Sequence, residues 1–252
     1  MPENNLNPRD HLDENRTPKP GTYRVIVADP PWDLHQRRTG KSKGYSAAED
    51  HYPVMSEKRI LGMGEAIREI AAEQSFCFLW VTTATLPLGI KVLEAWGYKY
   101  TSFYFWAKGR FTLGNSFRNA GELLLLGVHG KGTKVAFRSQ PNWGFFPLQS
   151  HSTKPSEVHL MIERLVGADE DTKMLELFAR RPAPSRLSWD LFGNEIPSSE
   201  PARISLAKWG YPVPGDHPAG AALAADAEGT AGIDIANSDG HTAQAAPAET
   251  QG

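Results

Sequence analysis

Tyr23-Arg24-Val25-Ile26-Val27-Ala28-Asp29-Pro30-Pro31-Trp32 is the stretch that decides the fold class of this chain. Residues 23–28 form a compact apolar run, which predicts a buried β-strand. The two prolines cannot continue that strand, because each lacks a backbone N–H and has a fixed φ. The sequence thus places a carboxylate, a rigid turn and an aromatic ring, which we expect to be exposed, at the carboxyl end of a strand. In open α/β sheets, ligands bind at this edge.

Strand and helix patterns alternate along the rest of the chain. Apolar residues spaced three and four apart predict helices at 60–70, at 86–93 with Gly97 as the stop, and at 155–165 with Gly167 as the stop. Strands are predicted at 23–28, 76–82, 100–107, 123–128, 174–179 and 188–192, and long loops at 109–120 and 130–150. This alternation predicts an α/β fold with a mostly parallel sheet and helices on both faces.

The composition is that of a globular protein with one sizeable core, since 40% of the 252 residues are hydrophobic. No apolar run is long enough for a transmembrane helix, and no apolar signal segment opens the chain, so we expect no membrane contact. The single cysteine, Cys77, favours a cytoplasmic location. Its place in a predicted strand suggests a core residue and disfavours cytosine carbon-5 methylation, which needs an accessible thiolate. The histidines show no metal-ligand spacing, and we predict no metal site.

Charge divides the chain into three parts. Residues 1–19 are polar and predict a disordered arm, residues 20–212 form the predicted catalytic domain, and residues 213–252 predict a disordered acidic, Ala/Gly-rich tail without any Lys or Arg. Within the domain, Glu122 is the only acid among the many bases of 99–138. Bases also follow the diproline directly (Arg37, Arg38, Lys41 and Lys43). Such clusters suit the phosphate backbone of a nucleic acid, although a solvated loop is an equal alternative for 37–43.

The four residues Asp29 to Trp32 suit the methylation of an exocyclic amine on a base. Such an amine is a poor nucleophile because its lone pair is delocalised into the ring. Asp29 and the carbonyl of Pro30 can accept its two hydrogens, and Pro31 keeps that carbonyl rigid, so the acceptors are preorganised. Trp32 offers a face on which a flipped base can stack. The alternative is a strand that ends in a turn with a core tryptophan.

An ordered series of further segments resembles the DPPW-type adenine N(6)-methyltransferase family, which includes the catalytic subunit of the mRNA adenosine methyltransferase. The resemblance covers about residues 22–196. After Asp29-Pro30-Pro31-Trp32 come the matching segments His51–Ser56, Trp80–Thr82, Glu94–Tyr98, Trp106–Lys108, Glu122–Val128, His151–Pro155, Leu175–Arg180 and Trp189–Glu195.

The resemblance implies a Rossmann-like methyltransferase sheet in permuted order, with the catalytic motif before the cofactor segment. It implies S-adenosyl-L-methionine as the cofactor, bound at Lys154, Arg180 and Asn194, with Glu122 on either the substrate or the cofactor side. From their chemistry, Lys154 can pair with the methionine carboxylate and Asp29 with the methionine amine. Glu176, Arg180 and Asn194 can bind ribose hydroxyls, and Tyr52 is placed with the substrate. Without the resemblance, Lys154 is a surface lysine and Glu176–Arg180 a structural ion pair. Arg181–Ala183 and Glu195 depart from the family's pattern.

The sequence therefore predicts an enzyme that transfers a methyl group to the N(6) amine of adenine in nucleic acid. DNA is preferred over RNA, because the domain is compact and shows no evident RNA-binding module. The alternatives are an RNA adenine methyltransferase, a cytosine N(4)-methyltransferase, and a non-catalytic nucleic-acid-binding subunit of the same fold.

Overall fold

The computed structural model describes residues 16–33, 54–112, 117–147, 154–182 and 184–214. The elements in chain order are β1 Tyr23–Ala28, α1 Glu57–Gly62, α2 Gly64–Ile70, β2 Ala71–Val81, α3 Leu86–Ala95, β3 Lys99–Thr112, β4 Asn119–His129, β5 Trp143–Phe145, α4 Glu157–Val166, β6 Met174–Leu177, β7 Trp189–Phe192 and the 3₁₀ helix η3 Ala207–Trp209.

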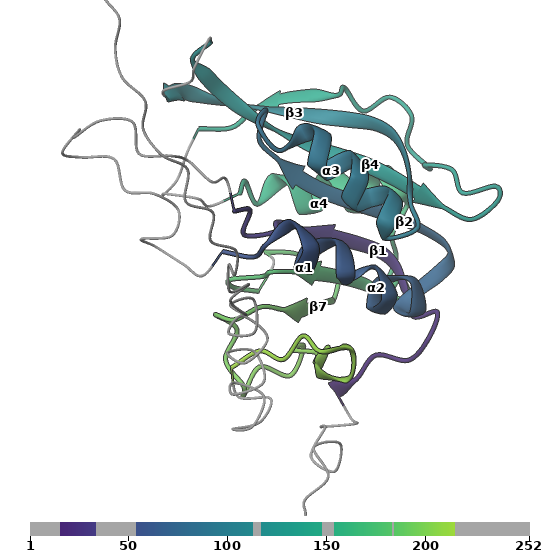
Figure 1. Cartoon of the computed structure of the whole chain (residues 1–252). Helices are drawn as coiled ribbons and strands as arrows, with labels where there is room; N and C mark the ends of the chain where they lie inside the picture. Colours follow the sequence, from purple (N-terminus) through teal and green to yellow (C-terminus); the bar gives the residue numbers. More distant parts are fainter. Residues whose placement is uncertain (1–15, 34–53, 113–116, 148–153, 183, 215–252) are drawn as a thin grey trace, which may run out of the picture.

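The strands form one sheet in the order β5-β3-β4-β2-β1-β6-β7 (Figure 1). β1 is parallel to β2 and β6, β6 to β7, and β3 to β5, whereas β4 is antiparallel to β2 and β3. The predicted α/β fold with a mostly parallel sheet is confirmed. After β1 the chain builds the β2 side of the sheet, and it later returns to add β6 and β7 on the other side. The carboxyl end of β1 is therefore a topological switch point, where α/β sheets bind ligands.

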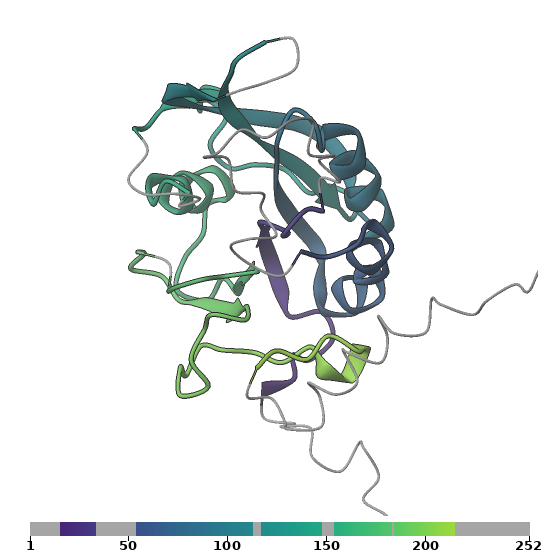
Figure 2. The same ribbon diagram turned by 60° about the vertical axis from the view of Figure 1, so that its left-hand side comes forward.

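Helices cover both faces of the sheet, as expected (Figure 2). One core contains side chains of α1, α2 and α3 together with Ile26, Leu79 and Leu175. The second core, on the opposite face, contains side chains of α4 together with Val25, Phe78 and Met174. Consecutive strand residues enter opposite cores because side chains alternate between the two faces of a sheet.

Several elements differ from the prediction. The helix expected at 60–70 is divided at Met63, which caps both α1 and α2. Gly64 permits a close approach here, since a Cβ at this position would lie 2.4 Å from the carbonyl oxygen of Ala95. Residues 109–120 are not simply a loop, because β3 extends to Thr112 and β4 begins at Asn119. The expected loop at 130–150 also contains a short strand, β5.

The packed domain extends further than 20–212. The carbonyl of Arg16 accepts a hydrogen bond from the backbone N–H of Ser205 at 3.0 Å. Val213 is only 5% exposed and belongs to the α1–α3 core. Residues 1–15 of the predicted arm and 215–252 of the predicted tail lie outside the described residues. Among the described helices, none has the length and apolar character needed to span a membrane.

Candidate active site

Side chains from four strands meet beyond the carboxyl end of β1, all on the face covered by α4. Asp29 follows Val27 by two residues and so shares its face, and Glu176 is paired with Val27 across β1 and β6. On the other side of β1, Trp80 lies in the α4-face core. Glu122 precedes Leu124 of that core by two residues and is paired with Trp106. Strand register thus explains why residues distant in sequence converge.

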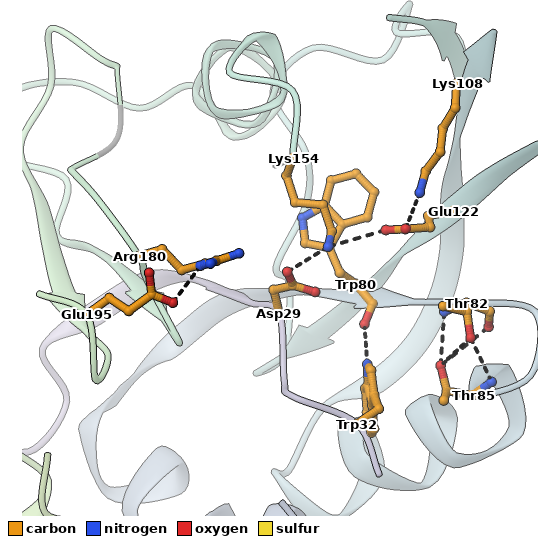
Figure 3. A network of polar contacts seen from close by, with 10 residues as sticks. All are labelled: Asp29, Trp32, Trp80, Thr82, Thr85, Lys108, Glu122, Lys154, Arg180 and Glu195. Carbon is orange, nitrogen blue, oxygen red and sulfur yellow. Dashed lines mark hydrogen bonds and ion pairs between the residues drawn. The ribbon is translucent and has the colours of Figure 1, made fainter. Parts of the chain in front are cut away.

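Lys154 lies at the centre of this group (Figure 3). Its Nζ is 2.6 Å from Oδ2 of Asp29 and 3.3 Å from Oε2 of Glu122, and it sits 5.5 Å from the centroid of the Trp80 ring. The other oxygen of Glu122 accepts a hydrogen bond from Lys108. The side chain of Lys154 is 19% exposed. The interpretation of Lys154 as a surface lysine is therefore wrong.

Enclosure and neighbouring charge shift the ionisation of this group. Burial raises the pKa of Asp29 above its ordinary value, Lys154 opposes this, and Glu122 and Glu176 add to it. Burial also disfavours the charged form of Glu122, but Lys154 and Lys108 outweigh it and lower the Glu122 pKa. For Lys154, burial is outweighed by Asp29 and Glu122, which raise its pKa. Lys154 and Glu122 are thus held ionised, whereas the raised pKa of Asp29 favours the acceptance of a proton by its carboxylate.

The diproline turn fixes the backbone beside Asp29. The carbonyl of Pro30 accepts a hydrogen bond from the N–H of Trp32 at 2.8 Å, and that of Pro31 accepts one from Met55 at 2.8 Å. A carbonyl oxygen has two lone pairs, so Pro30 keeps capacity for a second donor.

The expectation of an exposed ring at Trp32 is wrong. Trp32 is 8% exposed and belongs to the α1–α3 core. Its indole N–H donates to the carbonyl of Trp80 at 3.1 Å (Figure 3). The prolines turn the chain so that this large apolar ring is buried beneath the sheet's end instead of projecting over the site. Trp32 is therefore a core residue, as the alternative interpretation of this motif expected. Stacking of a base on Trp32 stays a prediction, and no exposed ring face supports it.

A cavity of about 290 Å³ opens beside Asp29 between β1, β6 and α4. Its polar lining includes Asp29, Lys154, Glu176, His159 and Arg180. Phe178 also lines it and has a φ of 62°, a left-handed conformation that is costly for an aromatic residue. The left-handed residue thus directly follows β6, in the wall of the cavity.

Glu176 is held by His159 of α4 and not by Arg180. Nε2 of His159 lies 3.1 Å from Oε2 of Glu176, and the imidazole meets Trp189 edge-on at 5.0 Å. The predicted Glu176–Arg180 ion pair is therefore wrong. Arg180 instead binds Glu195 at 2.6 Å, with both side chains about half exposed at the mouth of the cavity.

Among the described residues, Asn194 is the predicted cofactor-binding residue that the structure does not bring into this cavity. Asn194 lies in the turn after β7 with an exposed side chain, outside the set of described residues that line the cavity. Tyr52, Arg37 and Arg38, all predicted on the substrate side, lie outside the described residues. No cluster of metal-ligating side chains occurs in the part of the chain that the structure describes.

Two residues of the site were not identified in the sequence as site residues. Lys108 was noted among the bases of 99–138 and in the matching segment Trp106–Lys108 but not as a site residue, yet it binds Glu122. His159 sits next to the buried Val158 in an ordinary amphipathic helix pattern, which gives no signal of its own. Cys77 is fully buried on β2, as predicted. Burial raises the pKa of its thiol, which keeps it a neutral core residue.

The profile of the MT-A70 family matches residues 23–195, from the first residue of β1 to the glutamate that binds Arg180. The chain belongs to the MT-A70 family. This confirms the suspected family and agrees with the methyltransferase sheet described above.

Individual relatives match the same part of this MT-A70 chain. The N(6)-adenosine-methyltransferase catalytic subunit METTL3 of Homo sapiens is 30% identical over 188 residues, covering 70% of this chain and 28% of METTL3. METTL3 of Danio rerio is 31% identical over 188 residues, again with 28% of that protein covered. The type II methyltransferase M.MunI of Mycoplasma sp is 29% identical over 198 residues, which are 71% of this chain and 79% of M.MunI. The chain thus spans under a third of the METTL3 proteins but most of M.MunI.

Proposed function

We propose that this protein transfers a methyl group from S-adenosyl-L-methionine to the N(6) amine of adenine in nucleic acid, with DNA preferred over RNA. The observation that carries the proposal is the Asp29 carboxylate, placed by a diproline turn at the switch point and 2.6 Å from Lys154, in a family whose relatives are named adenosine methyltransferases. A cytoplasmic location belongs to the proposal, favoured by the single cysteine.

Asp29 and Pro30 act on the amine. The Asp29 carboxylate accepts one N–H and the second lone pair of the Pro30 carbonyl accepts the other, which directs the nitrogen lone pair out of conjugation. Both acceptors are fixed before the substrate arrives, so the transition state needs little reorganisation. Methyl transfer would form the N–CH₃ bond and break the bond between the methyl group and the sulfonium sulfur, leaving a neutral thioether, and the amine nitrogen would then lose a proton. A carboxyl group whose pKa is raised suits the role of acceptor.

The residues of the cavity fit the proposed cofactor. S-adenosylmethionine supplies an electrophilic methyl group on a sulfonium, together with an amino acid end and a ribose diol. Glu176, whose carboxylate is hydrogen-bonded to His159, can accept hydrogen bonds from the diol. An ammonium has three donors, and Lys154 uses two of them on Asp29 and Glu122, so one is left for the methionine carboxylate. Arg180 at the mouth is a second cation for that carboxylate.

The preference for DNA rests on the compact domain and on the extent of the match to a type II methyltransferase, most of whose length this chain spans. An RNA adenine methyltransferase and a cytosine N(4)-methyltransferase use the same amine chemistry. A non-catalytic subunit of the same fold is disfavoured, because a scaffold gains nothing from an intact Asp29–Lys154–Glu122 arrangement.

Incubation with methyl-labelled S-adenosylmethionine and separate DNA and RNA oligonucleotides, followed by nucleoside analysis, tests the proposal. We expect label in N(6)-methyladenine, with DNA labelled faster. Asp29→Asn should lower kcat by about 10²–10³-fold while the melting temperature is kept. The exposed Asp171→Asn serves as the matched control. Absence of labelled nucleoside with every substrate, or full turnover by Asp29→Asn, contradicts the proposal.

A further inference from the structure

Large aromatic side chains are exposed at one end of the sheet, around β5 and the β3–β4 hairpin. Phe117 is 86% exposed, Phe111 72%, Trp143 61% and Phe145 58%. We call these four residues the aromatic edge. Isolated exposed apolar residues are ordinary on a protein surface, but a group of large aromatic rings marks an interaction site.

The two rings of β5 project on the face opposite α4. Trp143 is paired with Phe105 and Phe145 with Ala107 in the parallel ladder to β3. Gly144 between them faces Tyr104 of the α4-face core, since a Cβ on Gly144 would lie 1.9 Å from the Tyr104 hydroxyl. Trp143 and Phe145 therefore share the other face, where β5 is the outermost strand.

The rings of β5 are continuous with the hairpin. The ring of Phe145 lies against Gly109, where an added Cβ would come within 2.9 Å of it. Gly109 has a φ of 70°, so a residue without a Cβ suits both the contact and the backbone. Arg110 and Phe111 follow directly on β3, and Phe117 and Arg118 lead into β4.

This hairpin stands beside the active site. β3 ends and β4 begins at the same edge of the sheet as the carboxyl end of β1 (Figure 1). At its base, Lys108 of β3 and Glu122 of β4 are bonded to each other, and Glu122 in turn contacts Lys154 (Figure 3). A strand whose target base lies at Asp29 therefore has its neighbouring nucleotides within reach of the hairpin.

Charge selects the partner of the aromatic edge. Arg110 and Arg118 are exposed, and neither has an ion-pair partner within the described residues. Between Lys99 and Ser156 the sequence contains one acid, Glu122, and two lysines already bind it. The surface thus combines flat rings with uncompensated positive charge. Single-stranded nucleic acid fits both, since bases stack on the rings and phosphates bind the arginines.

We propose that the aromatic edge with Arg110 and Arg118 is a stacking platform for the single-stranded nucleotides that flank the target adenine. The inference rests on the proposed function for the orientation of the strand, and it adds a surface and a strand requirement. Paired bases are stacked on each other inside a duplex and offer no free face, so the platform selects unpaired nucleotides.

Binding of a fluorescein-labelled 15-nucleotide single-stranded DNA, of its RNA counterpart and of the matching DNA duplex, followed by anisotropy on the full chain, tests the platform. Phe111→Ala/Phe117→Ala and Trp143→Ala should each weaken single-strand binding by about 5- to 150-fold, and duplex binding much less. Trp143→Phe should keep most of the affinity. Leu160→Ala is the matched control, because Leu160 is a 51% exposed apolar residue on α4, away from the edge.

Salt dependence separates the arginines from the rings. Arg110→Gln/Arg118→Gln should reduce the slope of log K against log salt by about 1.4, two phosphates' worth, whereas the ring variants should leave the slope unchanged. All of these side chains are exposed, so the variants should melt with the wild-type protein.

The two proposals fail separately. Wild-type methylation together with unaltered single-strand binding in the ring variants overturns the platform and leaves the proposed function standing. Lost binding in the variants of a protein that methylates no nucleic acid overturns the function instead. If the ring substitutions dissociate a dimer in sedimentation experiments without weakening binding per subunit, the aromatic edge is a contact between copies and the platform is wrong.

Discussion

Lys154 holds two carboxylates of the site with one ammonium group. Because Asp29 is partly buried and lies near Glu122 and Glu176, its pKa is above the ordinary value even with Lys154 in place. The ionised form of Asp29 is the one that accepts amine hydrogens. Activity should therefore rise with pH as Asp29 loses its proton, and Lys154 sets where that rise occurs.

Removal of the Lys154 ammonium should move the acid limb of the pH–rate profile to higher pH. In Lys154→Met the positive charge that lowers the Asp29 pKa is lost, so that pKa rises further. We expect kcat/KM to reach its plateau at a pH about 1–3 units higher than in the wild-type protein. Lys154→Arg keeps the charge and should keep the limb near its wild-type position. The measurement is kcat/KM across pH 5–9 for the three proteins. A profile of Lys154→Met that is lowered but not displaced contradicts this role.

His159 offers a test on the cofactor side alone. In His159→Phe the aromatic contact with Trp189 is retained, but Glu176 loses its hydrogen bond at 3.1 Å. We expect S-adenosylmethionine to bind about tenfold more weakly by calorimetry, with kcat at saturating cofactor changed much less. His159→Gln, which can still donate to Glu176, should recover part of the affinity. Equal affinity in all three proteins shows that His159 only fills space.

Sequence predicted the site residues that lie at the ends of elements within a recognisable motif. Asp29 and Lys154 stand beside prolines that mark a strand end and a helix start, and the structure brings them together. The sequence alone did not decide whether Trp32 is exposed or buried, because the direction of the chain after a diproline turn depends on tertiary packing. His159 was not predicted as a site residue, because its contact with Glu176 depends on how α4 packs against β6, and no local sequence pattern encodes that packing.

At the level of elements, the predicted strand at 23–28 agrees in both bounds, while the other predicted strands differ from the observed ones by one to five residues at one or both ends. Long apolar runs define strands well. β5 could not be predicted, since three residues in a stretch without a strand pattern become a strand only through pairing with β3. The division of α1 from α2 likewise depends on the approach of Gly64 to the end of α3.

Gly121 determines how closely β3 and β4 approach each other next to the site residue Glu122. It pairs with Ala107 immediately before Glu122, and an added Cβ would lie 2.3 Å from the carbonyl oxygen of Trp106 and 2.5 Å from the Phe105 ring. Gly121→Ala should force β3 and β4 apart, costing about 1–3 kcal/mol of stability and displacing Glu122 from Lys154. The free energy of unfolding, measured by chemical denaturation, and the turnover number should both be lower than in the wild-type protein. The neighbouring exposed Ala120→Ser is the control, and a Gly121→Ala protein of wild-type stability refutes the clash.

For the whole molecule, the topology explains why an early motif and a late segment share one site. β1 lies between β2 and β6, so the chain must traverse one half of the sheet before β6 places Glu176 next to Val27. The segment after β7 packs against α2. There, Lys208 and Trp209 bind the carboxylate of Glu69 in α2 at 2.8 and 2.9 Å.

That segment fixes where the chain can be shortened. Val213 is buried among α1–α3 core residues, and Nη2 of the buried Arg203 donates to the carbonyl of Pro214 at 2.9 Å. A chain ending at Pro212 exposes a core position and leaves that guanidinium short of an acceptor. It should therefore lose about 2–4 kcal/mol, seen as a melting temperature several degrees below that of a chain ending at Pro214. The chain ending at Pro214 should melt with the full-length protein, because residues 215–252 are acidic and lack aromatic anchors. Equal melting of the two truncated chains means that Val213 and Pro214 contribute nothing to the core, and a drop for both means that residues beyond Pro214 also pack.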